Sequence, residues 1–265
     1  MKYFLVAVIF TTIAGCGSSG WKLNREIKLT DITPLGLVAD NRGLWVSDVT
    51  GNRVVLLDFN GKILTVVDNL ERPMHIALHH DTIYVPEYTN DSITAIGQYG
   101  VVPIPIAEML DGPAGIAADD NTLAIADFYN NRILLKKNDR LYRLGKEGHN
   151  AGELYYPTDV AFYHGKIYVA DAYNNRVQVF DEAGQSLQII GDGDGIQVAT
   201  GITVDEQSVF VTDFEGNRIL IYDLEGALRY ILYDSLNKPT DLVVYQNKLY
   251  VANYGGNSIV EFIRD

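Results

Sequence analysis

Tyr168-Val-Ala-Asp171-Ala-Tyr173-Asn-Asn-Arg176-Val177 is one copy of a pattern that occurs six times along the chain and decides the fold. Each copy joins an apolar strand to a polar turn. The acidic position at the end of the strand recurs every 39 to 44 residues, at Asp48, Glu87, Asp127, Asp171, Asp213 and, as an amide, Asn253. A period near forty residues in strand-rich sequence is typical of the blades of a β-propeller.

A second landmark fixes the register of the repeats. A proline precedes the acidic position by 14 residues in five copies, at Pro34, Pro73, Pro113, Pro157 and Pro239, and only the fifth copy departs, with Ala199. Within the fourth copy, alternating apolar residues and turn signals predict four strands, over residues 158–162, 166–170, 176–180 and 185–190. We therefore predict an all-β fold, a six-bladed propeller of four-stranded antiparallel blades.

The two ends of the repeat region predict how the ring closes. The sixth copy ends at Asp265 after its third strand, whereas an alternating stretch near residues 25–31 has no blade of its own. We expect this N-terminal strand to complete the last blade, which would leave no open sheet edge there.

The first residues resemble a processed leader. An apolar run over residues 3–13 is too short to span a bilayer, and Ile13-Ala-Gly-Cys16 matches a bacterial lipobox with the only cysteine of the chain. We predict a lipoprotein signal peptide over residues 1–15, a lipidated tether over 16–24 and the propeller over 25–265. Diacyl and N-acyl chains, such as palmitate, on Cys16 would anchor the protein to a bacterial membrane, on its extracytoplasmic side.

The charge of the chain limits its partners. A formal net charge of −13 argues against nucleic acid and against docking on anionic lipid, so that only the lipid would hold the protein at the membrane. We expect a monomer.

The repeats resemble the NHL family of β-propellers. The resemblance rests on Pro-x-Gly/Asp-Ile/Val-Ala, an apolar strand ending in Asp, and Asn-Arg-Ile/Val; in the fourth copy these are Pro157-Thr-Asp159-Val-Ala161, Asp171 and Asn175-Arg176-Val177. It covers essentially all of residues 25–265. It implies a propeller, and it implies little about function, since the family includes scaffolds, receptors and some enzymes.

Four copies pair the aspartate with an arginine five residues later. We interpret these pairs as ion pairs that fix the turns rather than as a functional ring of charge: Asp48 and Arg53, Asp127 and Arg132, Asp171 and Arg176, Asp213 and Arg218. The second and sixth copies lack the arginine and carry Ser92 and Ser258 instead.

Aromatic side chains vary on this repeated frame. They occupy the turns between the second and third strands, which share a face with the crossings between blades, at Tyr88, Phe128, Tyr129, Tyr173, Phe214 and Tyr254. Solvent-facing aromatics often mark a binding surface, and the alternative is that they pack on neighbouring blades.

The position two residues after each proline should ring the channel mouth. Three copies place ionisable groups there, His75, Asp159 and Asp241, with Arg72 nearby. Nitrogen and carboxylate ligands from different blades could hold a divalent cation on the axis. Six-bladed lactonases and amidating lyases have a similar architecture and axial metals, although such lyases rely on several histidines. Aspartate is also ordinary at this position in NHL repeats.

Two functions follow from these residues. The first is a non-catalytic binding scaffold of the cell envelope for a protein, peptide or glycan partner, without a cofactor. The alternative is a metal-assisted hydrolase or lyase at the channel mouth, with His75 as a ligand, Asp159 and Asp241 as ligands or general base, and Arg72 stabilising an oxyanion. The absence of a recognisable catalytic motif favours the first. His79-His80 is expected to be an exposed turn.

Overall fold

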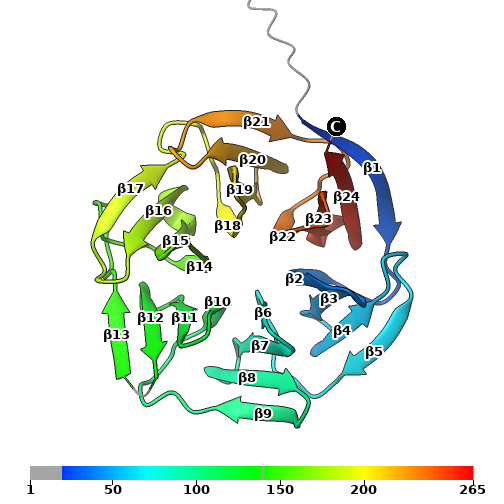
Figure 1. Cartoon of the computed structure of the whole chain (residues 1–265), viewed down its shortest axis with the longest axis horizontal. Helices are drawn as coiled ribbons and strands as arrows, with labels where there is room; N and C mark the ends of the chain where they lie inside the picture. Colours follow the sequence, from blue (N-terminus) through cyan, green and yellow to red (C-terminus); the bar gives the residue numbers. More distant parts are fainter. Residues whose placement is uncertain (1–19, 139, 265) are drawn as a thin grey trace, which may run out of the picture.

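The computed structural model describes residues 20–138 and 140–264, and these form a closed ring of six antiparallel sheets (Figure 1). The innermost strand of each sheet lies beside the central axis, and the outermost strand lies on the perimeter. The predicted six-bladed β-propeller with four strands in each blade is confirmed.

The first three blades follow the chain in order from the axis outward. Blade one contains β2 (Pro34–Asp40), β3 (Gly43–Asp48), β4 (Arg53–Leu57) and β5 (Ile63–Val67). Blade two contains β6 (Ala77–His79), β7 (Thr82–Glu87), β8 (Ser92–Gly97) and β9 (Gly100–Ile104). Blade three contains β10 (Pro113–Ala118), β11 (Thr122–Asp127), β12 (Arg132–Lys137) and β13 (Arg140–Leu144).

The remaining blades contain the two short 3₁₀ helices of the described chain. Blade four contains β14 (Pro157–Tyr163), β15 (Lys166–Asp171), η1 (Ala172–Asn174), β16 (Arg176–Asp181) and β17 (Ser186–Ile190). Blade five contains β18 (Ala199–Val204), β19 (Ser208–Asp213), β20 (Arg218–Asp223) and β21 (Leu228–Leu232). Blade six contains β22 (Pro239–Tyr245), β23 (Lys248–Asn253), η2 (Tyr254–Gly256), β24 (Ser258–Arg264) and β1 (Trp21–Lys28).

Blade six is closed by the N-terminal strand, as the sequence predicts. β1 pairs antiparallel with β24, from Trp21 opposite Arg264 to Lys28 opposite Ser258. The strand begins earlier than expected, so residues 21–24 belong to the propeller and not to the tether. The reason is that Trp21 is buried and packs edge-on against Phe210 of blade five, with ring centroids 5.8 Å apart.

The core lies between neighbouring blades. Along β15, Ile167 and Val169 pack into the cluster shared with blade three, whereas Tyr168 and Ala170 face the cluster shared with blade five. This alternation follows from the two-residue period of a strand. Both faces of each middle strand are therefore apolar, and the ring holds together by sheet-on-sheet packing.

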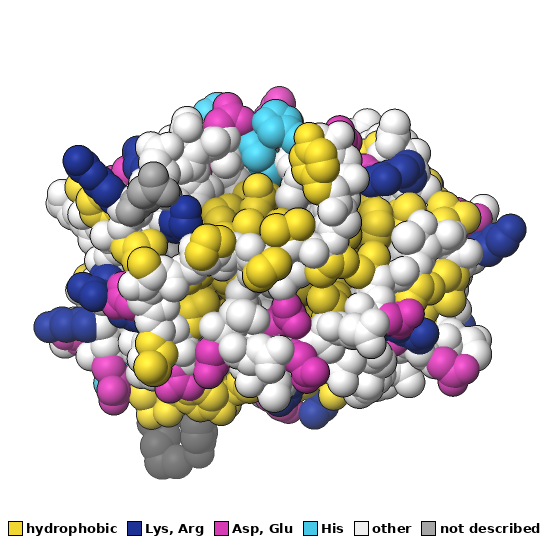
Figure 2. All heavy atoms as spheres, turned by 90° about the horizontal axis from the view of Figure 1, so that it is seen from below, with side chains coloured by type: hydrophobic (Ala, Val, Ile, Leu, Met, Phe, Trp, Pro, Cys, Tyr) yellow, Lys and Arg dark blue, Asp and Glu magenta, His cyan; other side chains and the backbone are white. Residues whose placement is uncertain are grey.

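The outer strands, on the perimeter of the ring, expose several hydrophobic side chains. Ile63, Leu64 and Val66 of β5 and Val101 and Val102 of β9 are exposed. Figure 2, a view onto the side of the ring, shows hydrophobic side chains across much of this surface. Among the described residues, no helix is long and apolar enough to cross a membrane.

Candidate functional site

The residues two positions after the prolines, or after Ala199 in blade five, alternate around the axis between glycine and a larger side chain. Gly36, Gly115 and Gly201 occupy blades one, three and five, and His75, Asp159 and Asp241 occupy blades two, four and six. Each glycine lies against the backbone of the next blade. A Cβ on Gly115 would be 2.5 Å from the Thr158 carbonyl oxygen and 2.7 Å from the Asp159 Cα. Only every second blade therefore has room for a side chain on the axis.

His75, Asp159 and Asp241 converge as a buried axial triad. The His75 Nδ1 is 3.6 Å from the Asp241 Oδ2 and 3.8 Å from the Asp159 Oδ2, and all three residues are at most 5% exposed. They lie within the channel and thus deeper than the mouth expected from the sequence. Each carboxylate also accepts a backbone N–H from the next blade, from Ile202 to Asp159 at 2.9 Å and from Leu37 to Asp241 at 2.7 Å.

Burial and charge set the protonation of the axial triad. Burial raises the pKa of Asp159 to about 7, because its charged form is poorly solvated, and the nearby His75 offsets this only in part. Burial opposes protonation of His75, but the carboxylates of Asp159 and Asp241 outweigh it and raise the pKa of the imidazole.

The axial triad fits a divalent cation. Among the described residues, the buried His75 Nδ1 has no hydrogen-bond partner. Its nitrogen and the two carboxylates offer ligand atoms that all lie within 4.8 Å of one another. Two ligands about 2.2 Å from one ion, at an angle near 115°, are about 3.7 Å apart, which is the spacing found here. Imidazole and carboxylate are also ligands that first-row metals accept.

The axial triad separates two cavities of the channel. On one side, about 220 Å³ is lined by the inner strands of the blades, including Asp159 and Asp241. On the crossing face, a funnel of about 330 Å³ is lined by His75 and Arg72 and by four aromatic residues, Phe128, Tyr173, Phe214 and Tyr254. Thr158, Thr200 and Thr240 contribute polar groups to the funnel lining. The funnel is thus an apolar cavity with polar groups at its base.

The structure divides the six predicted aromatics into two groups. On blades two to four, Phe128 contacts Tyr129 and Tyr173, with centroids 5.0 and 6.4 Å apart. The Tyr88 hydroxyl donates to the Tyr129 hydroxyl at 2.8 Å, and burial with this hydrogen bond raises the pKa of Tyr88. Phe214 and Tyr254 form a separate pair on blades five and six, 6.0 Å apart.

Sequence analysis missed two members of the larger group. Tyr155 and Tyr156 lie in the crossing before Pro157, and Tyr156 contacts Phe128 at 4.8 Å and Tyr173 at 5.1 Å. We name Tyr88, Phe128, Tyr129, Tyr155, Tyr156 and Tyr173 the aromatic patch. Within it, Tyr129 and Tyr173 are the most exposed, at 49% and 56%.

Two cations lie over aromatic rings at the edge of the funnel. The Arg72 guanidinium lies 4.6 Å from the Tyr88 centroid, and the Lys238 ammonium lies 5.0 Å from the Phe214 centroid. The Arg72 guanidinium thus lies against Tyr88 and lines the same funnel as His75.

The four aspartate–arginine pairs fix the turns. In each, the arginine Nε is 2.7 to 2.9 Å from the aspartate Oδ2. The aspartate side chains are fully buried, and their Oδ1 atoms accept backbone N–H groups from the preceding crossing, such as Tyr155 to Asp171 at 2.7 Å. Blade six reproduces this contact with Asn253, which accepts from Asn237 at 2.6 Å. Cys16 lies outside the described residues.

Comparison with known proteins gives the same architecture. The family model DUF5128, described as a 6-bladed beta-propeller, matches residues 147–258. Protein brain tumor from Drosophila melanogaster is 28% identical over 137 residues, which cover 49% of this chain and 13% of that protein, so the chain spans about an eighth of its length. The fold is shared.

Two solved structures extend the comparison over most of the chain. A catalytically inactive virginiamycin B lyase from Staphylococcus aureus, solved with quinupristin, is 20% identical, with a TM-score of 0.69 over 91% of this chain and 85% of that one. A gluconolactonase from Xanthomonas campestris is 16% identical, with a TM-score of 0.75 over 90% and 89%. At these identities the likeness concerns the fold alone.

Proposed function

We propose that the protein is a binding scaffold that holds a protein, peptide or glycan partner on its crossing face. The observation that carries this proposal is the funnel together with the adjacent aromatic patch. A cavity of about 330 Å³ falls in the size range of ligand sites, which is roughly 300–1,000 Å³. Partly exposed tyrosine rings provide large, rigid contact area, and their hydroxyls provide hydrogen bonds, which suits recognition.

The charged residues at the rim of the funnel indicate which chemical groups the partner would carry. Arg72 presents a cation beside Tyr88, whereas Lys238 beside Phe214 pairs at 3.7 Å with Glu215, the only acidic residue among the described residues lining the funnel. A segment with an apolar or ring-shaped group and a neighbouring anion would satisfy both features. The partner would insert that group between Phe128, Tyr173 and Phe214 and place its anion towards Arg72.

The test is capture of partners from detergent-solubilised membranes. The variant Tyr129→Ala with Tyr173→Ala should capture at least roughly tenfold less partner than wild type, because central aromatic residues dominate binding energy. Tyr99→Ala with Tyr142→Ala is the matched control, since both tyrosines are exposed and lie on the outer hairpins of blades two and three. Equal loss, or no loss, in the two double variants contradicts the proposal.

We also propose that a lipid on Cys16 holds this scaffold on the extracytoplasmic side of a bacterial membrane. The support is the lipobox and the lone cysteine. Metabolic labelling with a fatty acid should mark the wild-type chain and leave Cys16→Ser unlabelled. Equal label in both would exclude the anchor.

The axial triad favours a second candidate function, a metal-assisted hydrolase or lyase. The specific observation is the unpartnered His75 Nδ1 facing two carboxylates. A bound cation would polarise a carbonyl or activate water. His75, Asp159 and Asp241 would hold it, and the funnel would position the substrate above His75. Metal analysis after dialysis should then find one equivalent more in wild type than in His75→Gln; the same metal content in both excludes this function.

A further inference from the structure

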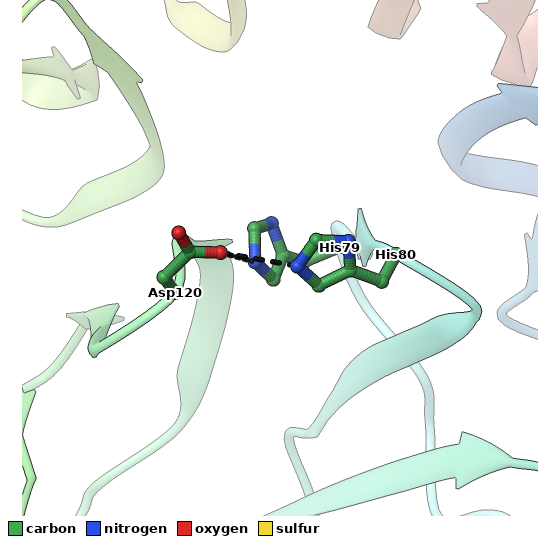
Figure 3. Close-up of side chains that lie close together, drawn as sticks. All are labelled: His79, His80 and Asp120. Atoms are coloured by element: carbon green, nitrogen blue, oxygen red, sulfur yellow. Dashed lines mark hydrogen bonds and ion pairs between the residues drawn. The ribbon is translucent and has the colours of Figure 1, made fainter.

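A separate group of ligating side chains lies at the opposite end of the ring from the funnel. His79 ends β6, His80 follows in the turn to β7, and Asp120 lies in the corresponding turn of blade three. The Nε2 atoms of both histidines are 3.0 Å from the Asp120 Oδ1 (Figure 3). These turns join the first and second strands of their blades, so they lie at the end of the ring away from the crossings.

The backbone explains why two successive histidines face one carboxylate. Neighbouring side chains of a strand point to opposite faces, so His79 and His80 would diverge in a regular strand. His80 instead adopts φ +51°, in the left-handed region, where the chain turns back on itself. The two rings consequently lie 4.1 Å apart between centroids and present their Nε2 atoms together. In Figure 2, histidine and acidic side chains gather at the upper rim of the ring.

We propose that His79, His80 and Asp120 bind a first-row divalent metal ion, of which Zn²⁺ is the probe, in a site distinct from the axial triad. Two imidazoles with one carboxylate are a ligand set for Zn²⁺, Cu²⁺ and Ni²⁺. Two ligands about 2.1 Å from one ion are about 3.0 Å apart at a right angle and about 3.4 Å apart at the tetrahedral angle of Zn²⁺, so the 3.0 Å between each nitrogen and the Asp120 oxygen requires at most a shift of a few tenths of an ångström.

The surroundings of these residues suit a cation. The His80 and Asp120 side chains are 77% and 75% exposed, so water can complete the coordination. Asp119 lies beside them, and its carboxylate accepts the N–H groups of Asn121 and Thr122, which keeps it in place. The nearby Lys137 is neutralised by Glu182, with 2.8 Å between nitrogen and oxygen.

A metal here would join blade two to blade three. β6 has only three residues and is the shortest strand of the described chain, and Pro73 pairs with Glu87 as an isolated bridge outside it. The histidines therefore extend from the least extensively paired inner strand. A cation shared with Asp120 would tie the end of this strand to its neighbour, so metal binding should raise the melting temperature by mass action.

The experiment uses the purified protein after treatment with a chelator and dialysis. Zn²⁺ is titrated by calorimetry near pH 7.5, where ordinary imidazoles are neutral, and melting temperatures are measured with and without Zn²⁺. His80→Ala and Asp120→Asn should each weaken binding at least roughly tenfold and abolish the rise in melting temperature, since even residues supporting metal ligands contribute about 10–100-fold. Both positions are exposed, so the variants should fold.

His164→Ala is the matched control, because His164 occupies the equivalent hairpin turn of blade four, with φ +48° and no second histidine. It should bind Zn²⁺ as wild type does, and so should His75→Gln at this site. The proposal is overturned if wild type binds no Zn²⁺, if His80→Ala and Asp120→Asn bind it unchanged, or if only His75→Gln removes it. The last result would assign the metal to the axial triad instead.

Discussion

The surroundings of Asp159 disfavour the ionised form of its carboxyl group. Asp159 is 5% exposed, lies beside another carboxylate, and has a pKa raised from its usual 3.8 to about 7. His75, with a raised pKa, stabilises the fold below its unfolded value near 6.5, and this contribution disappears as the pH rises through the folded value. Both shifts have the same sign: the folded axial triad holds more protons than the unfolded chain between about pH 4 and pH 7.

We therefore expect the axial triad to lower the free energy of unfolding as the pH rises. The slope is at most about 1.4 kcal/mol per pH unit for each extra proton bound. Asp159→Asn removes one titrating group and keeps its shape, so denaturation in chelator from pH 5 to pH 8 should show a flatter profile. Asp192→Asn, an exposed aspartate of a crossing, should leave the profile parallel to wild type. The same slope in Asp159→Asn and wild type would contradict the assignment.

Some members of the aromatic patch could be predicted from the sequence, and others could not. The turn aromatics were predictable because they vary at a fixed position of the repeat. Tyr156 was not predictable. Its ring contacts Phe128 because its backbone is left-handed, at φ +53°, and no local sequence pattern predicts that conformation for a tyrosine. The available signal was its position next to Pro157, which in blade two holds Arg72, a residue already assigned to the crossing face.

At the scale of the elements, the turns between the second and third strands of blades one, three and five are hydrogen-bonded to the crossing that leads into the next blade. The asparagine before each of the four arginines adopts a left-handed conformation. In blades one, three and five its Oδ1 accepts an N–H from the next crossing: Asn52 from Arg72, Asn131 from Tyr156 and Asn217 from Lys238, at 2.8 to 3.0 Å. The repeated Asn-Arg pair thus combines two contacts. Arginine fixes its own turn, and asparagine fixes the neighbouring blade.

The sixth blade suggests how to test the arginine contact. There, Asn253 and Ser258 replace aspartate and arginine, and the Asn253 amide donates to the Ser258 hydroxyl at 3.0 Å. Asp213→Asn alone should destabilise blade five by about 3 kcal/mol, because it leaves Arg218 without its carboxylate. Adding Arg218→Ser recreates the pair of blade six and should recover part of that loss in urea denaturation. A double variant less stable than Asp213→Asn would show that the arginine acts independently of the aspartate.

The glycines that face the axis give a second test at the scale of the strand. Gly115→Ala places a Cβ 2.5 Å from a backbone oxygen of blade four, so β10 and β14 must separate. We expect a loss of about 2–3 kcal/mol in the free energy of unfolding. Gly97→Ala, whose Cβ would be 3.3 Å from the nearest atom, the Thr82 Oγ1, should change it by less than about 1 kcal/mol. Equal losses would mean that close approach does not explain the alternation.

In the whole molecule, the ring closes through pairs far apart in sequence. The blades and their boundaries follow from local patterns, so they were predictable to within about one residue in blade four. The need for an N-terminal strand also followed, from the missing strand of the sixth repeat. The position of His75, Asp159 and Asp241 near one axis also followed from the repeat. The distances between them did not, because they depend on how closely Gly36, Gly115 and Gly201 pack against the neighbouring blades.

The strength of the closure depends on Glu261 of β24. Its side chain is fully buried and pairs with Arg25 of β1, whose Nη2 is 2.9 Å away, and with Lys248 at 3.2 Å. Burial opposes its ionisation, but Arg25, Asn24 and Lys248 outweigh this and lower the pKa of Glu261 below its usual 4.5. An acid with a lowered pKa stabilises the fold above its unfolded value, and this stability disappears as the pH falls through the folded value.

Arg25→Ala should therefore weaken the ring at its seam. We expect a loss of about 2 kcal/mol in the free energy of unfolding at neutral pH, because a buried carboxylate loses its main partner, although Lys248 limits the loss. The penalty should shrink in acid, as the pH falls below the usual 4.5 and through the lowered pKa of Glu261. Arg229→Ala is the matched control: Arg229 also lies on an outer strand and pairs with Asp223, but within one blade and on the surface, so it should change stability by less than about 1 kcal/mol. Denaturant titrations of both variants at pH 7 and in acid make the comparison. Equal losses at pH 7 would mean that the seam between β1 and β24 is no more sensitive than any other outer strand of the propeller.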